Sequence, residues 1–216
     1  SDQHRLHLGF GGYTANWGFH MAGLYENDNE RDEIITGYLG VGAAAGDLQL
    51  YCPVEQSAEE FKEKILRQKP ELNEKLNNPR YFNIQSARNL YYPNGYFSPW
   101  EMDDSLNAFY EQNVKNQGIS VRATAEMSWA LEAIPGTEDL MAYESRLNYF
   151  IPGKPWISIC MYNLKKFSGD VIMQVLQTHP FVINGGIITQ NPYYQDPDKW
   201  LKNNAPEFLP KDKTHA

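Results

Sequence analysis

VRATAEMSWALEAIPGTEDLMAYESRLNY, residues 121–149, is the stretch that decides the predicted fold. Its start, residues 120–125, has the composition of a short strand, and the Pro135-Gly136 pair breaks the chain before the next element. A helix follows, because apolar residues recur there at helical spacing: Leu140, Met141, Leu147 and Phe150. Glu126 and Trp129 therefore stand just past the end of a buried strand, where the sheets of α/β proteins bind ligands.

Predicted strands and helices alternate along the rest of the chain. Strand composition marks residues 20–25, 47–52, 81–86 and 156–162, with edge strands at 181–183 and 186–189. Helical spacing or capping residues mark 29–45, a helix beginning at Ser57, 102–118 and 170–178. Residues 156–162, WISICMY, are almost entirely apolar, as in strands covered on both faces. We therefore predict an α/β fold: a three-layer, mostly parallel sheet with helices on both faces.

Composition divides the chain into three parts. Residues 1–18 are rich in Gly, aromatics and His, and we expect an irregular N-terminal arm with at most a short strand. Residues 19–189 form the main domain, and residues 190–216 form a C-terminal tail with a helical turn at Trp200-Leu201. His4 and His7 have a spacing that suits a metal, but a floppy chain end holds ligands poorly, so their role stays open.

Size and charge exclude several classes of protein. A chain of 216 residues suits one domain, and a net charge of -8 argues against direct nucleic-acid binding. No apolar run reaches the roughly 18 residues that a membrane span needs, and no signal peptide is visible. The two cysteines, Cys52 and Cys160, form no CxxC pair, so we expect a reduced, cytoplasmic protein with both thiols buried.

Several catalytic motifs are missing from the sequence. It has no G-x-x-x-x-G-K-[ST] phosphate loop, no G-x-S-x-G elbow and no H-E-x-x-H. The glycines at 40, 42 and 46 follow a predicted helix rather than a strand, which is the wrong context for a nucleotide fingerprint. A zinc site would need the scattered residues His20, His179, Cys52 and Cys160, and we predict no metal site.

The ends of the predicted strands indicate a pocket. Glu126, Trp129, Tyr162 and Tyr25 stand at such ends, which share one edge of a parallel sheet. The aromatic segment 88–100 would cover this pocket as a lid, or would pack its own aromatic cluster.

Structural alternatives remain open for three groups of residues. Glu126 would pair with Arg122 or His20, and His179 would cap the helix before it. Asp103-Asp104 would cap the start of the helix at 102–118.

Several motifs recur together in the order and spacing of a known family. They are HMAGLYE at 20–26, Gly46-Asp47 with Leu50-Tyr51, RATAEMSWAL at 122–131, YESRLN at 143–148, CMY at 160–162, and THP at 178–180 followed by Gly185-Gly186. Together they resemble the MEDS domain, the methanogen/methylotroph sensory domain typified by the dichloromethane-responsive repressor. The resemblance covers about residues 19–186. Ala22 departs from it, because the family usually has Cys at that position.

The resemblance implies a fold and a role. The family looks like a degenerate relative of the ATPase core of circadian-clock and recombinase proteins, with the sheet kept and the P-loop lost. Glu126 would then occupy the place of the metal-binding carboxylate of those ATPases. The resemblance implies that family members sense C1, halogenated or hydrocarbon-type compounds of one-carbon metabolism in methylotrophs and methanogens. They would act in signal transduction and transcription regulation. Their output partners would be a kinase or a DNA-binding regulator.

Three hypotheses follow for this chain. The first is a stand-alone sensory domain without catalytic residues, which binds a small molecule and signals through a partner protein. Its ligand-binding residues would be His20, Tyr25, Glu126, Trp129, Tyr162 and His179. The second is an enzyme or cofactor-binding protein of C1 or halocarbon metabolism that uses Glu126. The third is a protein-interaction scaffold without a small ligand. The ligand and any cofactor stay unknown, and a homodimer is a candidate assembly.

Overall fold

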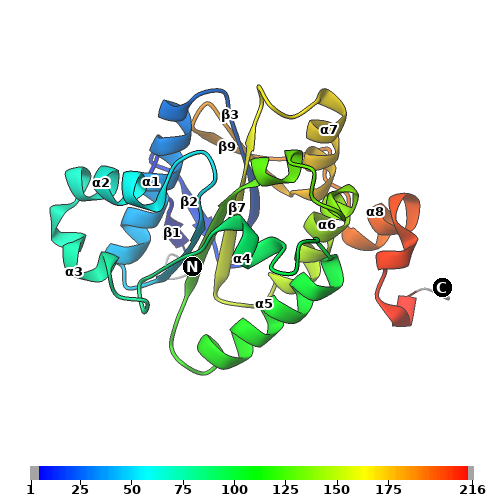
Figure 1. The fold of residues 1–216 in the computed structure, drawn as a ribbon, viewed down its shortest axis with the longest axis horizontal. Coiled ribbons are helices and arrows are strands. Elements are labelled where there is room, and N and C mark those ends of the chain that lie inside the picture. The colour runs from blue at the N-terminus through cyan, green and yellow to red at the C-terminus, as the bar shows by residue number, and fades with distance from the viewer. Residues whose placement is uncertain (1–4, 214–216) are drawn as a thin grey trace.

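The computed structural model describes residues 5–213, and within them seven strands form one sheet in the order β5-β4-β6-β7-β3-β8-β9 (Figure 1). Neighbouring strands pair in parallel except for β8 and β9, which are antiparallel. The strands are β3 (His20–Tyr25), β4 (Leu48–Cys52), β5 (Phe82–Ile84), β6 (Val121–Glu126), β7 (Trp156–Asn163), β8 (Phe181–Asn184) and β9 (Ile187–Gln190). The predicted mostly parallel sheet is confirmed. Of the two strands predicted as edge strands after residue 180, β9 is at the edge, whereas β8 lies between β3 and β9.

Helices cover both faces of this sheet and complete the three layers. One face packs against α1 (Asp28–Ala44), α2 (Ala58–Gln68) and α3 (Asn73–Leu76). The other face packs against α4 (Ala87–Tyr91), α5 (Pro99–Asn113), α6 (Leu140–Phe150) and α7 (Gly169–Thr178). A last helix, α8 (Pro197–Asn204), lies against α6 and α7 and contains the predicted turn at Trp200-Leu201. Among the described residues, no helix combines the length and apolar character needed to cross a bilayer.

Each central strand sends alternate side chains into two separate cores. On β7, Ile157, Ile159 and Met161 join the core under α1, whereas Trp156 and Cys160 join the core under α5 and α6. All eight residues of β7 are buried, as the apolar run predicted. This alternation decides which residues at the strand ends can meet.

The connection from β3 to α1 is too short to form a phosphate loop. Only Glu26 and Asn27 separate the two elements, and the Asn27 side chain accepts a hydrogen bond from the backbone N–H of Glu30 at 3.0 Å. Asp28 and Glu30 add negative charge to the first helical turn. A two-residue acidic connection has neither the length nor the charge to hold a phosphate at the helix N-terminus.

Helix α5 begins earlier than predicted. Ser98 is its N-cap and Pro99 its first residue, and both residue types are favoured at those positions. The predicted capping role of Asp103-Asp104 is therefore wrong, because both residues lie in the second turn. Asp103 instead pairs with Arg146 of α6, whose Nε donates to Asp103 Oδ2 at 2.8 Å.

The N-terminal segment is more regular than an arm. β1 (Arg5–His7) and β2 (Thr14–Asn16) form an antiparallel two-stranded sheet, and Leu8 and Phe10 in the turn between them are buried. The His4 and His7 pair, whose role was left open, lies partly outside the described residues, because His4 precedes them. The backbone carbonyl of His7 accepts a hydrogen bond from Arg122 Nη1 at 2.6 Å.

Two glycines let this hairpin lie directly on α1. A Cβ atom added at Gly37 would lie 2.2 Å from the carbonyl oxygen of Gly9, and Gly9 itself has a φ of +86°. We expect Gly37→Ala to lower the free energy of unfolding by about 1–3 kcal/mol, because the backbone contact leaves no room for a methyl group. Urea unfolding measures the loss, and limited proteolysis within residues 8–18 measures detachment of the hairpin.

Gly169→Ala is the matched control for this variant. Gly169 begins α7, and a Cβ atom added there would have no heavy atom within 4 Å, so the extra methyl group meets only open space. Its stability should be unchanged or slightly higher. Equal effects of the two substitutions would show that the close contact between Gly9 and Gly37 is unimportant.

Candidate functional site

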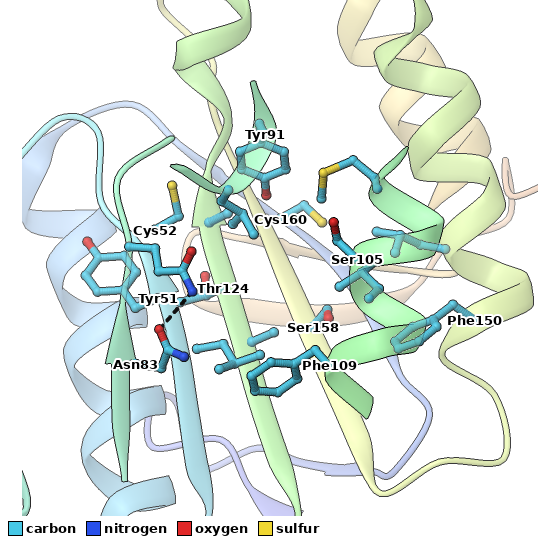
Figure 2. A pocket seen from close by; sticks show the side chains of 18 of the residues that line it. Tyr51, Cys52, Asn83, Tyr91, Ser105, Phe109, Thr124, Phe150, Ser158 and Cys160 are labelled. Carbon is cyan, nitrogen blue, oxygen red and sulfur yellow. Dashed lines mark hydrogen bonds between the residues drawn. The ribbon is translucent and has the colours of Figure 1, made fainter. Parts of the chain in front are cut away.

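A cavity of about 240 Å³ lies between the sheet and the helices α4, α5 and α6 (Figure 2). Its floor is formed by small side chains of β6 and β7: Ala123, Ala125, Ser158 and Cys160. Its walls are large apolar and aromatic side chains from the helices and strand ends: Leu90, Tyr91, Met102, Leu106, Phe109, Tyr143, Leu147, Phe150 and Trp156. Small residues on the strands opposite bulky residues on the helices leave the space open.

The mouth of the cavity is polar. Asn83 and Gln85 lie on one side and Asn89 and Ser105 complete the opening, with Asn89 and Ser105 exposed. Figure 2 shows Asn83 and Ser105 on opposite sides, and the dashed hydrogen bond joins Gln85 Nε2 to Asn83 Oδ1 at 3.0 Å. A polar mouth and an apolar interior are typical of small-molecule sites.

A buried polar cluster lies beside the cavity, and Cys160 belongs to both. Its members are His20 of β3, Glu144 of α6, Cys160 of β7 and His179, which ends α7; each is at most 6% exposed. Cys160 Sγ lies 3.5 Å from His20 Nε2 and 3.3 Å from Glu144 Oε1. The donor atoms of these four residues all lie within 4.8 Å of one another.

Glu144 is the centre of this cluster. Its Oε2 accepts a hydrogen bond from the Tyr162 hydroxyl at 2.6 Å and lies 3.1 Å from His179 Nε2. Burial alone raises the pKa of Glu144, but His179 and His20 outweigh it and hold that pKa well below its usual range. Glu144 is therefore a carboxylate anion in the interior of the protein.

The outer nitrogens of both histidines are held by oxygen acceptors. His20 Nδ1 lies 3.0 Å from Asn148 Oδ1, whose amide nitrogen donates to the carbonyl of Thr178 and so fixes the amide orientation. His179 Nδ1 lies 2.8 Å from the carbonyl of Val175, which can only accept. Each Nδ1 therefore carries a proton, and each Nε2 is directed toward Glu144 and Cys160.

Burial and the neighbouring His179 lower the pKa of His20, and Glu144 opposes that decrease. His179 Nε2 is buried and has no aligned hydrogen-bond partner among the described residues, although it approaches Glu144 closely. Two imidazole nitrogens, a thiol and a carboxylate are thus gathered at one point. The predicted capping of α7 by His179 is also present, through its contact with Val175.

A second polar network lies on the opposite face of the sheet. Glu126 accepts hydrogen bonds from the Tyr51 hydroxyl and, at 2.8 Å, from the backbone N–H of Glu55. Tyr25 donates to Glu55, and Asn163 Nδ2 donates to the same carboxylate at 2.9 Å. Burial raises the pKa of Glu126, and the hydrogen bond from Tyr51 opposes that rise. The network fixes the loop after β4.

The predicted structural partners of Glu126 are wrong. Arg122 instead donates from Nε to Asp47 Oδ2 at 2.9 Å, and His20 lies in the cluster around Glu144. Arg122 precedes Glu126 by an even number of positions on β6, so both point to the α1 face, but they lie at opposite ends of the strand.

The six predicted ligand residues fall into three places. His20, Tyr162 and His179 lie together in the Glu144 cluster, whereas Tyr25 and Glu126 belong to the network on the other face. Trp129 follows β6 and stacks on Tyr91 with ring centroids 4.5 Å apart. Tyr91 and Phe97 of the aromatic segment 88–100 thus pack on Trp129, and Tyr91 also lines the cavity.

Glu144 and the cavity floor were missed by sequence reasoning. A signal for Glu144 exists, since it falls between Leu140 and Leu147 on the apolar stripe of α6, where a carboxylate is unexpected. Of the four residues weighed for a zinc site, His20, Cys160 and His179 come together with Glu144. Cys52 lies on β4 and is not part of the group.

Two solved structures have a similar fold. Flagellar accessory protein FlaH from Methanocaldococcus jannaschii has a TM-score of 0.55 and 18% identity, over 87% of this chain and 79% of that one. A KaiC-like protein from Pyrococcus horikoshii OT3 has a TM-score of 0.53 and 16% identity, over 82% of this chain and 78% of that one. The fold is therefore that of KaiC-like and recombinase-type ATPase cores, here without a P-loop.

A second comparison shows the family of the chain. Residues 19–180 match the model of the MEDS domain, described as MEthanogen/methylotroph, DcmR Sensory domain. The chain belongs to this family of sensory domains. No curated protein matches the chain.

Proposed function

We propose that this sensory domain binds a small uncharged molecule of the C1, halogenated or hydrocarbon type in the cavity between the sheet and α4–α6. The proposal rests on the uncharged lining of the cavity. Among the described residues that form it, none is Asp, Glu, Lys or Arg, and most are apolar or aromatic. Such a lining favours ligands without formal charge, because a buried ion would lack a partner.

The size of the cavity supports the same class of ligand. Drug-sized ligands occupy pockets of about 300–1,000 Å³, which is more than the volume available here. A nucleotide would in addition need a phosphate cradle, which the short acidic connection between β3 and α1 does not supply.

Dichloromethane is a suitable first probe. With about −1.5 kcal/mol as the ceiling per non-hydrogen atom, its three such atoms allow about −4.5 kcal/mol, a dissociation constant of about 0.5 mM at best. Titration to tens of millimolar, followed by amide chemical shifts in NMR, covers that range. We expect saturable shifts centred on Ala123, Cys160 and Tyr91, which line the cavity.

Ala123→Phe tests whether the cavity is the binding site. Ala123 lies on the cavity floor, so a benzyl group there occupies the space and should weaken dichloromethane binding at least about tenfold. Ala108→Phe is the matched control, since Ala108 is exposed on α5 and lies outside the cavity lining. Shifts that do not saturate, or equal binding by both variants, would contradict the proposal.

Signalling through a partner completes the proposal. The candidate partners are a kinase or a DNA-binding regulator, and homodimerisation through the edge strand β9, where Ile187 is 53% exposed, is a further candidate.

Cys52 and Cys160 are free thiols, consistent with a reducing, cytoplasmic compartment. Both oxygens of Glu126 accept hydrogen bonds from within the chain, so the enzyme alternative gains no support from this residue.

A further inference from the structure

We propose that His20, Glu144, Cys160 and His179 bind one Zn²⁺ ion between β3, β7, α6 and the end of α7. These residues offer two imidazole nitrogens, one sulfur and one carboxylate oxygen. Mg²⁺ and Ca²⁺ prefer oxygen-only sites, whereas imidazole and thiolate together suit Zn²⁺. The site shares Cys160 with the lining of the ligand cavity, whereas its other three residues lie outside that lining, and the proposal does not depend on which molecule the cavity binds.

Three distances between donor atoms match the edges of a tetrahedral site. With Zn–N and Zn–O near 2.1 Å and Zn–S near 2.3 Å, the edges of a regular tetrahedron are about 3.4–3.6 Å long. Cys160 Sγ is 3.5 Å from His20 Nε2 and 3.3 Å from Glu144 Oε1, and His20 Nε2 is 3.6 Å from Glu144 Oε1. The fourth donor, His179 Nε2, lies within 4.8 Å of the other three.

The histidines are oriented as metal ligands are. In metal sites the second ring nitrogen usually donates to a carbonyl or carboxylate, which fixes the tautomer and aims the lone pair at the ion. Asn148 and Val175 provide those acceptors for His20 and His179. His179 Nε2 is completely buried yet lacks an aligned hydrogen bond among the described residues, and a bound ion would satisfy it.

Charge balance also favours the ion. A thiolate, a carboxylate and two neutral imidazoles around Zn²⁺ sum to zero, which suits a buried site. Cys160 would bind the ion as a thiolate, so its thiol would give up a proton on binding. Zn²⁺ would form the bond to sulfur as that proton leaves to solvent. Four protein donors close the coordination shell, as in structural zinc sites.

Metal content of the full chain tests the proposal. The protein is purified under reducing conditions, loaded with Zn²⁺, passed over a desalting column and measured by inductively coupled plasma mass spectrometry. We expect about one Zn²⁺ per chain, and a loss of at least about fivefold in Cys160→Ser and His179→Ala. Cys52→Ser is the matched control, because Cys52 is an equally buried free thiol of the same sheet and lies outside the cluster.

Co²⁺ loading of the unmodified protein gives a readout that does not depend on variants folding. A thiolate ligand gives a sulfur-to-cobalt charge-transfer band, and tetrahedral Co²⁺ gives intense visible bands. We expect both kinds of band in the unmodified protein. Both should also be present in Cys52→Ser. Less than about a tenth of an ion per chain after loading, or equal metal content in Cys160→Ser and Cys52→Ser, would overturn the proposal. Dichloromethane binding would survive either result, so the two proposals fail separately.

Discussion

Replacing Glu144 by Ala is expected to lower the free energy of unfolding by about 3–5 kcal/mol, because the substitution leaves buried polar partners without their common acceptor. Tyr162 loses the hydrogen bond from its hydroxyl, and His20 and His179 lose the anion that both of them face. For a chain of this size each kcal/mol shifts the melting temperature by about 2–4 °C, so a decrease of about 10 °C is expected. Calorimetry and urea unfolding measure it.

Glu63→Ala is the control for this variant. Glu63 is an exposed glutamate of α2, and its replacement should change stability by less than about 0.5 kcal/mol. A loss below about 1 kcal/mol for Glu144→Ala would contradict the account, since it would mean that the buried cluster contributes little to folding.

Arg122→Met is the second variant with a large expected effect, again about 3–5 kcal/mol. Arg122 is 1% exposed, and its guanidinium joins three parts of the chain: Asp47 after α1, the carbonyl of His7 at the end of β1, and the carbonyl of Tyr38 in α1. Methionine fills similar volume but donates no hydrogen bond. The variant therefore leaves the Asp47 carboxylate buried and unpaired, and urea unfolding measures the cost.

A double variant separates the charge from the packing. Adding Asp47→Leu to Arg122→Met removes the unpaired carboxylate, so the double variant should recover part of the lost stability. Arg67→Met on the exposed side of α2 is the matched control and should be nearly neutral. If the double variant loses at least as much free energy of unfolding as the two single variants added together, the inferred pairing of Arg122 with Asp47 is wrong.

Periodicity and end signals were enough to predict the sheet and most of its covering helices; α4 lies largely in the segment 88–100, which was interpreted as a loop. The unbroken apolar run of β7 predicted a strand buried on both faces, and Ser57 with Glu60 forms the expected capping box at the start of α2. The start of α5 was placed three residues late, because Ser98-Pro99 lay inside a segment interpreted as an aromatic loop.

Placement of the site residues depended on information of two kinds. Strand alternation was available from the sequence: His20 and Tyr25 are five positions apart on β3 and therefore point to opposite faces. The register between strands was not available, since nothing local to β6 or β7 says that Ala125 lies beside Cys160. The cavity is a product of that register, because small side chains from two strands must meet to form its floor.

Anomalous X-ray diffraction from crystals soaked in dibromomethane is the most direct test of the central claim, that the cavity between the sheet and α4–α6 is the ligand site. The anomalous signal locates bromine atoms independently of the electron density of the protein and water. Dibromomethane resembles dichloromethane in shape and lack of charge. The account predicts bromine peaks inside the cavity, in contact with Ala123 and Cys160. Bromine bound only elsewhere, with ordered water filling the cavity, would contradict it.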